Sequence, residues 1–348
     1  MLFIMGGEGL ICAIAALFGV GDFKASFGHV PWHGLHFMDT VFPLFLFMAG
    51  VSFPFSLSKS RERGLVTGQI AWRCVRRGVT LIFLGLVYCG LLKLDFAHQR
   101  VYSVLGSIGF SWMVAALLYL AFGIRVRLAI ALGLLTFSTL FFGLVPAPDA
   151  PADAVRFSAE WHFGCWIDRT FFGGHIYRPL FDPEGAAGVP TAIVTAMLGM
   201  FAGDIVRAGG VEASARKAAK LLVCALISAV LGFAVSWFYP INKALWSPSF
   251  TLVVGGYSFA IFALFYWIID VKGVSRWTFF FRVIGMNSIA IYMLQAIVPM
   301  HQVSGYFFGG FARLLPELWC AVIMQVAYIA TCWLVLWFLY RKQTFFKV

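Results

Sequence analysis

Long apolar runs separated by short polar loops repeat along almost the whole chain. A helix needs about 20 mostly apolar residues to cross a bilayer, and several stretches without Asp, Glu, Lys or Arg reach this length. They cover residues 40–58, 101–124, 128–148, 185–203, 221–242, 244–269, 283–312 and 318–340. The run 78–92 is shorter, but basic residues at its ends can extend to the interface. Together with the apolar start at 1–20, the pattern predicts about ten transmembrane helices.

The composition is typical of an all-α, polytopic membrane bundle, and we expect residues 1–348 to form one transmembrane domain. The chain is 61% hydrophobic and 12% charged, whereas soluble proteins carry about 25% charged residues. Its net charge of +11 does not indicate nucleic-acid binding, because the basic residues lie in short loops between apolar runs. The cysteines form no CxxC motif and the start lacks signal-peptide features, so we expect no disulfide framework, zinc site or signal peptide.

The loops alternate in basic charge, and this alternation predicts which of them face the cytoplasm. Lys and Arg concentrate within residues 59–77, 125–127, 207–220, 272–282 and 341–347. Because loops rich in Lys and Arg tend to stay in the cytoplasm, both termini are predicted to lie there. All seven histidines and the longest connection, about residues 147–187, are then extracytoplasmic.

Histidines gather just before the apolar run that starts at residue 40. Imidazole titrates near neutral pH, so His29 is a candidate acid/base group, although an exposed loop histidine is often only solvated. His29, His33 and His36 would share a helical face and could then hold a metal. Pro31 and Gly34 argue against a helix there, and we expect no metal site.

The acidic residues near helix starts have two interpretations. Asp39 can cap the helix that follows or act as a polar partner, and Asp182-Pro-Glu184-Gly is an ordinary helix start. The loop 147–187 combines carboxylates, guanidinium groups and aromatic rings, which suits a sugar ligand but also an interfacial aromatic belt. These loop residues are Trp161, His162, Trp166, Asp168, Arg169, His175, Tyr177, Arg178, Asp182 and Glu184.

Other polar positions leave similar alternatives open. Lys243 is the only charge in a short turn, where it can bind an anion or anchor the turn at the interface. Asn287 and Gln295 lie inside an apolar run, so they line a cavity or join helices. The cluster Arg73, Arg76 and Arg77 follows from the positive-inside bias, but it can also contact the phosphates of a nucleotide-like cofactor. The sequence contains none of the motifs GxxxxGK[ST], GxGxxG, HExxH and GxSxG.

Several of these segments, taken in order, resemble a known family. The chain is similar to the heparan-α-glucosaminide N-acetyltransferases, a family of transmembrane acyltransferases with bacterial relatives. The similar segments are His29-Val-Pro-Trp-His-Gly34, Asp39-Thr-Val-Phe-Pro43, Gly50-Val-Ser52, Ile167-Asp-Arg169, Asp182-Pro-Glu-Gly185, Ile241-Asn-Lys-Ala-Leu-Trp246, Asp270-Val-Lys-Gly273, Gly285-Met-Asn-Ser288 and Tyr340-Arg-Lys342.

The resemblance implies transfer of an acetyl group from cytosolic acetyl-CoA to an amino sugar or sugar hydroxyl across the membrane. His29 stands where the family has its proposed catalytic histidine and would act as base or acyl carrier, with Asp39 as its partner. Asn242, Lys243 or Asn287 would offer a dipole or charge to the oxyanion of the tetrahedral intermediate. We expect Arg73, Arg76, Arg77 and Arg282 to contact the cofactor. The expected substrate-binding residues are Trp32, Arg100, Asp168, His175, Asp182, Glu184, Asn242 and Lys243.

The resemblance also implies a location in the bacterial inner membrane, with lipid and a glycan acceptor as partners; self-association is left open. The alternative function is a secondary transporter of an anionic or sugar-like solute, although no pair of Gly/Pro-broken helices recurs in the two halves.

The chain departs from the family pattern in three places, and the last two bear on the acceptor or the cofactor contacts. The family has a basic, polar stretch before its first core helix, whereas this sequence begins inside that helix, which implies a truncated sequence or a late start of translation. An asparagine that precedes the catalytic histidine falls at Phe18 or Gly19. Gly106-Ser107 replaces a Gln-Arg pair.

Overall fold

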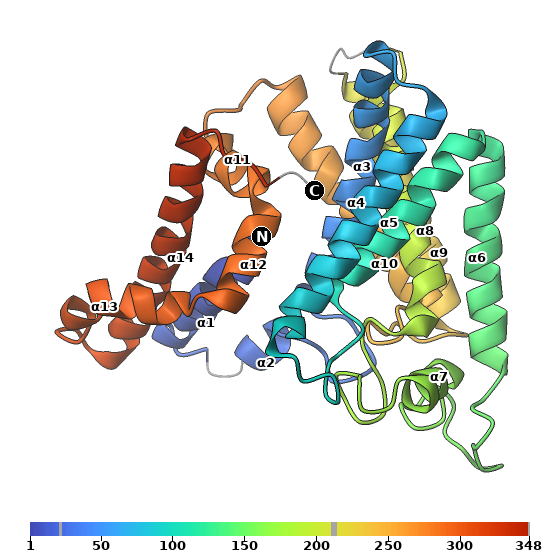
Figure 1. Cartoon of the computed structure of the whole chain (residues 1–348), viewed down its shortest axis with the longest axis horizontal. Helices are drawn as coiled ribbons and strands as arrows, with labels where there is room; N and C mark the ends of the chain where they lie inside the picture. The colour runs from blue at the N-terminus through green and yellow to red at the C-terminus, as the bar shows by residue number, and fades with distance from the viewer. Residues whose placement is uncertain (21–22, 210–213, 347–348) are drawn as a thin grey trace. The chain divides into compact units, whose positions relative to one another are not determined.

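The computed structural model describes residues 1–20, 23–209 and 214–346, and regular structure in these ranges is helical (Figure 1). One isolated antiparallel bridge joins Pro146 and His162. This arrangement confirms the predicted all-α class. The helices are η1 Phe3–Gly7, α1 Glu8–Leu17, α2 Phe23–Phe27, η2 Phe37–Thr40, α3 Val41–Glu62, α4 Thr67–Tyr88, η3 Leu91–Lys93, α5 Val104–Ala121, α6 Ile124–Leu144, α7 Phe163–Phe171, η4 Ala186–Gly188, α8 Val189–Arg207, α9 Ala215–Ser236, α10 Pro248–Tyr266, η5 Trp267–Val271, α11 Thr278–Met286, α12 Ser288–Ile297, α13 Met300–Ala312 and α14 Glu317–Arg341.

Within the described ranges, seven helices are long and apolar enough to cross a membrane. They are Phe37–Glu62, Val104–Ala121, Ile124–Leu144, Ala186–Arg207, Ala215–Ser236, Pro248–Val271 and Glu317–Arg341. The pair α11 and α12, bent by 66°, gives an eighth if it is counted as one span. The predicted membrane bundle is therefore confirmed, while the count of about ten stays a prediction.

The remaining predicted spans differ from the structure for identifiable reasons. The span predicted at 78–92 is wrong in its boundaries: α4 begins at Thr67, so Arg73, Arg76 and Arg77 lie inside the helix. The apolar run 283–312, long enough to hold one spanning helix and an outward loop, contains most of three helices, α11, α12 and α13. Asn287, at φ −130° and ψ 35°, leaves the helical region and produces the first break.

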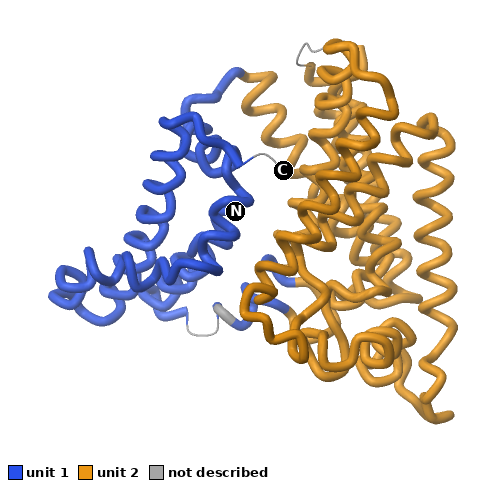
Figure 2. Tube along the Cα trace, viewed as in Figure 1, with its two compact units in different colours: residues 1–29, 36–38, 273–348 blue, residues 30–35, 39–272 orange. Residues whose placement is uncertain are grey.

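The chain divides into two compact units, which Figure 2 colours separately. Unit 1 comprises Met1–His29, His36–Met38 and Gly273–Val348, and unit 2 comprises Val30–Leu35 and Asp39–Lys272. The expectation that residues 1–348 act as one domain stays a prediction.

Unit 2 is built around α3 and α8, which lie side by side in its centre (Figure 1). Its main apolar core includes Leu46, Phe53, Trp112, Met197 and Phe250, contributed by α3, α5, α8 and α10. The helices α9 and α10 pack along each other, as do α4 and α5. Residues far apart in the sequence therefore share one core.

Glycines allow the backbones of α3 and α8 to touch. A Cβ atom on Gly199 would lie 1.9 Å from the carbonyl oxygen of Phe47, and one on Gly50 would lie 2.2 Å from that of Ala196. Small residues at helix crossings permit this close approach in membrane bundles, where packing drives association. The α3–α8 contact fixes the ends of both helices, near which the polar residues described below lie.

In unit 1, the segment formed by η1 and α1 packs against α14. The core contains Met5, Ile291, Met300, Cys332 and Leu336. Gly6 has a φ of +100°, a conformation that favours glycine, at the kink inside η1. The N-terminal and C-terminal segments of the chain therefore form one apolar core.

We predict that Gly199→Ala lowers the thermal unfolding midpoint of the purified protein, because the added methyl group collides with the α3 backbone. Overpacking ordinarily costs about 1–3 kcal/mol. The matched control is Gly133→Ala in α6, where an added Cβ meets nothing within 4 Å and helix propensity should raise stability by up to about 1 kcal/mol. Equal shifts for both variants would contradict the tight α3–α8 crossing.

Candidate active site

The segment 28–36 is not helical, which confirms the prediction made from Pro31 and Gly34. His29 has an exposed side chain and ends the first stretch of unit 1, and Val30 opens unit 2. A non-helical backbone removes the shared face that a three-histidine metal site would need. Among the residues that the structure describes, no group of three or more His, Cys, Asp or Glu side chains is placed to hold a metal ion.

Asp39 is completely buried and binds the loop that follows His29. Its Oδ2 accepts the backbone N–H of Val30 at 3.3 Å, and its Oδ1 lies 3.5 Å from Nζ of Lys243. The capping interpretation is wrong, because α3 has Thr40 as its N-cap without a side-chain cap bond. A buried carboxylate needs a charged or hydrogen-bonding partner, and here it has both.

Lys243 is held in a mostly buried position in the turn between α9 and α10. Burial lowers the pKa of its ammonium group, and the negative charges of Asp39 and Glu184 oppose that shift. The lysine is therefore ion-paired with Asp39, near the start of α3, and is also attracted by the charge of Glu184, ahead of η4.

Asn242 joins the same turn to the loop 30–35. Its Oδ1 accepts the backbone N–H of Leu245 at 2.9 Å, so its Nδ2 is the atom that faces Nδ1 of His33 at 3.3 Å. An amide nitrogen only donates, so Nδ1 of His33 accepts and the neutral ring carries its proton on Nε2. The backbone N–H of Gly34 also donates to the carbonyl of Ile241 at 2.9 Å.

Arg100 forms the second ionic centre, just before α5. Its Nε and Nη2 bind Asp182 Oδ2 and Oδ1 at 2.8 and 2.6 Å, a bidentate pair, and Nη2 also binds Glu184. Asp182 accepts the backbone N–H groups of Tyr177 and Glu184 as well. Its predicted role as a helix N-cap is wrong, since the next helix begins at Ala186 with Gly185 before it.

Asp168 supports this turn from α7. Its two oxygens accept the backbone N–H groups of Asp182 at 3.3 Å and Ala186 at 3.1 Å. Burial raises its pKa to about 6, against the opposing effect of these hydrogen bonds and of Tyr102. A Cβ on Gly185 would lie 2.0 Å from Asp168 Oδ2, so the carboxylate requires a glycine there.

Two ion-paired groups, Asp39 with Lys243 and Arg100 with Asp182 and Glu184, are linked by the electrostatic attraction between Lys243 and Glu184. We call these five side chains of alternating charge the charged cluster. Burial raises the pKa of Glu184, and the positive charges of Arg100 and Lys243 oppose this. Each charge has a neighbour of opposite sign, which offsets the cost of burying it.

Two other predicted substrate residues have mainly backbone partners. Trp32 donates its indole N–H to the carbonyl of Phe157 at 2.8 Å and packs edge-on against Phe181. His175 contacts the carbonyl of Gln99 through Nδ1 at 3.0 Å. Both anchor loops around the charged cluster.

His162 is a buried polar residue that sequence reasoning did not single out. Its Nδ1 accepts the N–H of Gly164 at 3.1 Å, so Nε2 carries the proton in the neutral ring and donates to the Tyr239 hydroxyl at 2.7 Å. Burial lowers its pKa to about 4, with a smaller contribution from His33. The sequence places His162 in the aromatic loop 147–187, but no local sequence pattern predicts its contact with Tyr239, 77 residues further along the chain.

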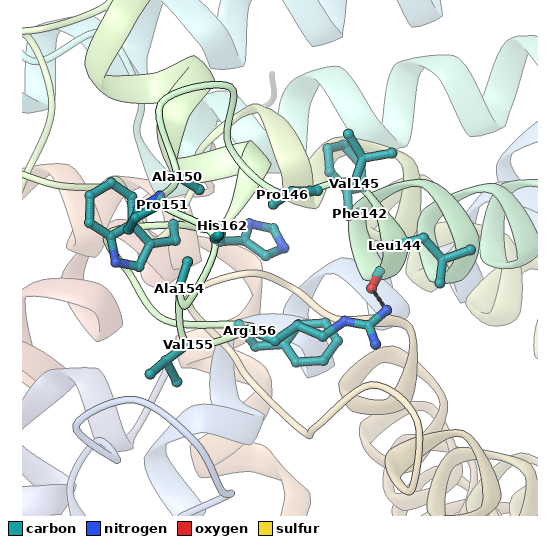
Figure 3. Close-up of a pocket in the computed structure, with 14 residues that line it drawn as sticks. Phe142, Leu144, Val145, Pro146, Ala150, Pro151, Ala154, Val155, Arg156 and His162 are labelled. Carbon is teal, nitrogen blue, oxygen red and sulfur yellow. Dashed lines mark hydrogen bonds between the residues drawn. The ribbon is translucent and has the colours of Figure 1, made fainter.

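A cavity of about 490 Å³ lies between the end of α6 and the loop up to His162. Figure 3 shows the Arg156 side chain reaching from this loop toward the end of α6, where it donates to the carbonyl of Gly143. Phe157, which also lines the cavity, has a φ of 62° and accepts the Trp32 indole N–H. The volume falls in the range of about 300–1,000 Å³ typical of ligand pockets.

The predicted cofactor arginines of unit 2 lie in the first half of α4. Arg73 and Arg76 are exposed, whereas the Arg77 guanidinium stacks 4.4 Å above the Trp112 ring. Two of the three guanidinium groups therefore face outward from α4.

In unit 1, Asn287 binds the C-terminal tail. Its Nδ2 donates to the carbonyl of Thr344 at 3.1 Å, and its Oδ1 accepts the N–H of Phe346 at 3.0 Å. An oxyanion role for Asn287 stays a prediction and requires the Nδ2 bond to open. Arg282, on α11 of the same unit, has an exposed side chain.

The lowered pKa of His162 predicts a specific pH dependence. His162 binds a proton near pH 6.5 in the unfolded chain but only near pH 4 in the folded chain. Its contribution to the free energy of unfolding is therefore complete above pH 6.5 and is lost as the pH falls toward 4. We expect the stability advantage of the wild type over His162→Gln to shrink by on the order of 3 kcal/mol across this window. Thermal unfolding at pH 7.5, 5.5 and 4.5 measures it, and a constant difference would contradict burial of the neutral ring.

No protein-family model matches the chain. Human heparan-alpha-glucosaminide N-acetyltransferase is 30% identical over 401 aligned residues, which include 98% of this chain and 58% of the human protein. The mouse protein of the same name is 29% identical over 397 residues, with 98% of this chain and 59% of the mouse protein covered. The chain thus spans somewhat under two thirds of these relatives. Its similarity to the heparan-alpha-glucosaminide N-acetyltransferases, predicted from short motifs, is confirmed along nearly its whole length.

Proposed function

We propose that this protein is a membrane-embedded acetyltransferase that moves an acetyl group from cytosolic acetyl-CoA to a glucosamine-like acceptor on the opposite side. The observation that carries the proposal is the charged cluster, whose Asp39 holds the backbone directly after His29. Similarity to two named acetyltransferases over 98% of the chain supports it.

The arrangement of helix ends supports the proposed orientation. If successive helices of unit 2 cross the membrane alternately, the starts of α3, α5, α8 and α10 share one side, and every member of the charged cluster lies near such a start. Most basic loop residues fall at the other ends, which the positive-inside bias assigns to the cytoplasm. We infer cytoplasmic termini, about ten spans, an extracytoplasmic loop at 147–187 and a bacterial inner membrane.

His29 would remove the proton that the acceptor must lose. When the amine nitrogen attacks the thioester carbonyl, a C–N bond forms, the C–S bond breaks and the thiolate leaves with the electron pair. An imidazole with a pKa near the operating pH suits the base, which contributes about 10²–10⁴-fold. In the second version of the mechanism, His29 accepts the acetyl group first and passes it to the acceptor.

Asp39 would act as a positioning residue. It binds the amide of Val30 and pairs with Lys243, so it restricts the backbone from which the His29 side chain extends. Lys243 and Asn242 come from the same turn and would offer a positive charge and an amide N–H to the developing oxyanion, a type of stabilisation that often dominates acyl transfer.

The acceptor would bind on the side of the charged cluster. Trp32 would offer an aromatic face, with His175, Asp168 and the Arg100–Asp182–Glu184 group shaping the loops around the sugar. The cavity beside Arg156 is large enough for a sugar ring and shares Phe157 with the Trp32 contact.

Acetyl-CoA would supply the activated acetyl thioester from the cytoplasmic side. We propose that Arg73, Arg76 and Arg77 contact its phosphates, because guanidinium groups bind phosphate through paired, charge-assisted hydrogen bonds. The exposure of Arg73 and Arg76 on α4 supports this assignment. A phosphate contact of Arg282, in unit 1, is a separate proposal.

We predict that His29→Ala lowers acetyl transfer by at least 10²-fold, as loss of a general base should. The assay supplies labelled acetyl-CoA to the outside of inverted membrane vesicles, which exposes the cytoplasmic face, and measures labelled glucosamine inside. The matched control is His98→Ala, since His98 is exposed and its side chain bonds with Asp95. Equal activity of wild type and His29→Ala would remove His29 from the mechanism, and solute uptake without transfer would favour a transporter.

A further inference from the structure

An apolar groove runs between α6, α8, α9 and α10 of unit 2, away from the charged cluster. Its volume is about 490 Å³. Its lining includes Leu132, Leu198, Phe201, Asp204, Lys220 and Leu252. All four helices are candidate membrane spans, so this apolar surface is of the kind that lipid chains cover.

Charged residues gather at one end of the groove. Asp204 lies in the last turn of α8 and Lys220 near the start of α9, and both line it. Arg127, near the start of α6, donates from Nη2 to Asp204 at 3.1 Å. Its guanidinium carbon also lies 5.6 Å from the ring of Phe201, another lining residue.

Arg127 lacks partners for its remaining donors. Its side chain is only 8% exposed, and within the described part of the chain neither Nε nor Nη1 has a hydrogen-bond partner. The other oxygen of Asp204 is taken by the Tyr119 hydroxyl. Arg127 does not itself line the groove, but it binds Asp204, which does. Buried donors without acceptors are costly, so an anionic group beside Asp204 and Lys220 would be favoured by this guanidinium.

The local charge favours an anionic headgroup. Arg127 and Lys220 outnumber Asp204 at this end of the apolar channel, and Arg207 acts on the neighbouring Tyr119, so the net charge there is positive. We propose that the groove binds an anionic phospholipid, with one acyl chain along α6 and α9 and its phosphate near Lys220 and Arg127. The phosphates of coenzyme A carry several negative charges, which Arg127 and Lys220 would not neutralise.

Lipid binding is testable without the transfer reaction. The purified full-length protein in detergent is titrated with phosphatidylglycerol or phosphatidylcholine of identical acyl chains, and bound lipid is counted by native mass spectrometry. We expect at least tenfold tighter binding of phosphatidylglycerol. Lys220→Gln should remove most of this preference, whereas Arg216→Gln, an exposed cation on the same helix, should keep it.

A second pair of variants tests the acyl-chain site. Leu132→Trp should fill the groove and reduce binding of both lipids, whereas Leu140→Trp, exposed on the same helix but outside the groove, should not. Equal affinity of the wild type for both lipids, or an unchanged preference in Lys220→Gln, would overturn the proposal. Displacement of phosphatidylglycerol by equimolar palmitoyl-CoA would also overturn it, in favour of an acyl-CoA site.

Discussion

The buried pair of Asp39 and Lys243 is the contact on which the proposed active site depends. A single buried charge is costly in a water-poor setting, so Asp39 and Lys243 each need the other as a partner. Glu184 and Arg100, from the loops before α8 and α5, also lie beside charges of opposite sign. Electrostatic attraction therefore links five residues from four separate segments. The backbone amide of Val30 is bound to this cluster, which restricts the segment that carries His29.

The helix packing provides the frame for the charged cluster. Because α3 and α8 touch backbone to backbone at Gly50 and Gly199, the residues just before these helices are held at fixed positions. Asp39 precedes α3 and Asp182 precedes η4 and α8. Fixed charges stabilise a transition state best when they do not reorient during the reaction, and a rigid scaffold provides this.

Much of the fold follows from the sequence, because the length of an apolar segment is a local property that decides whether a helix can cross the bilayer. The family resemblance likewise implied roles for Asp39, Arg100, Asp182 and Lys243. Their partners could not be derived, because local rules assign Asp39 and Asp182 to helix caps, whereas tertiary packing pairs them with cations. The break at Asn287 was also missed, since an asparagine inside an apolar run gives no sign that its amide binds the tail.

The most direct test of the Asp39–Lys243 pair is a double-mutant cycle on acetyl transfer. Asp39→Asn, Lys243→Met and the double variant are compared with the wild type, with folding checked by thermal unfolding. If the pair acts as one unit, the double variant loses no more activity than the more damaged single variant, since the loss of either partner already frees the loop. Losses that multiply independently, or single variants with wild-type activity, would contradict the account.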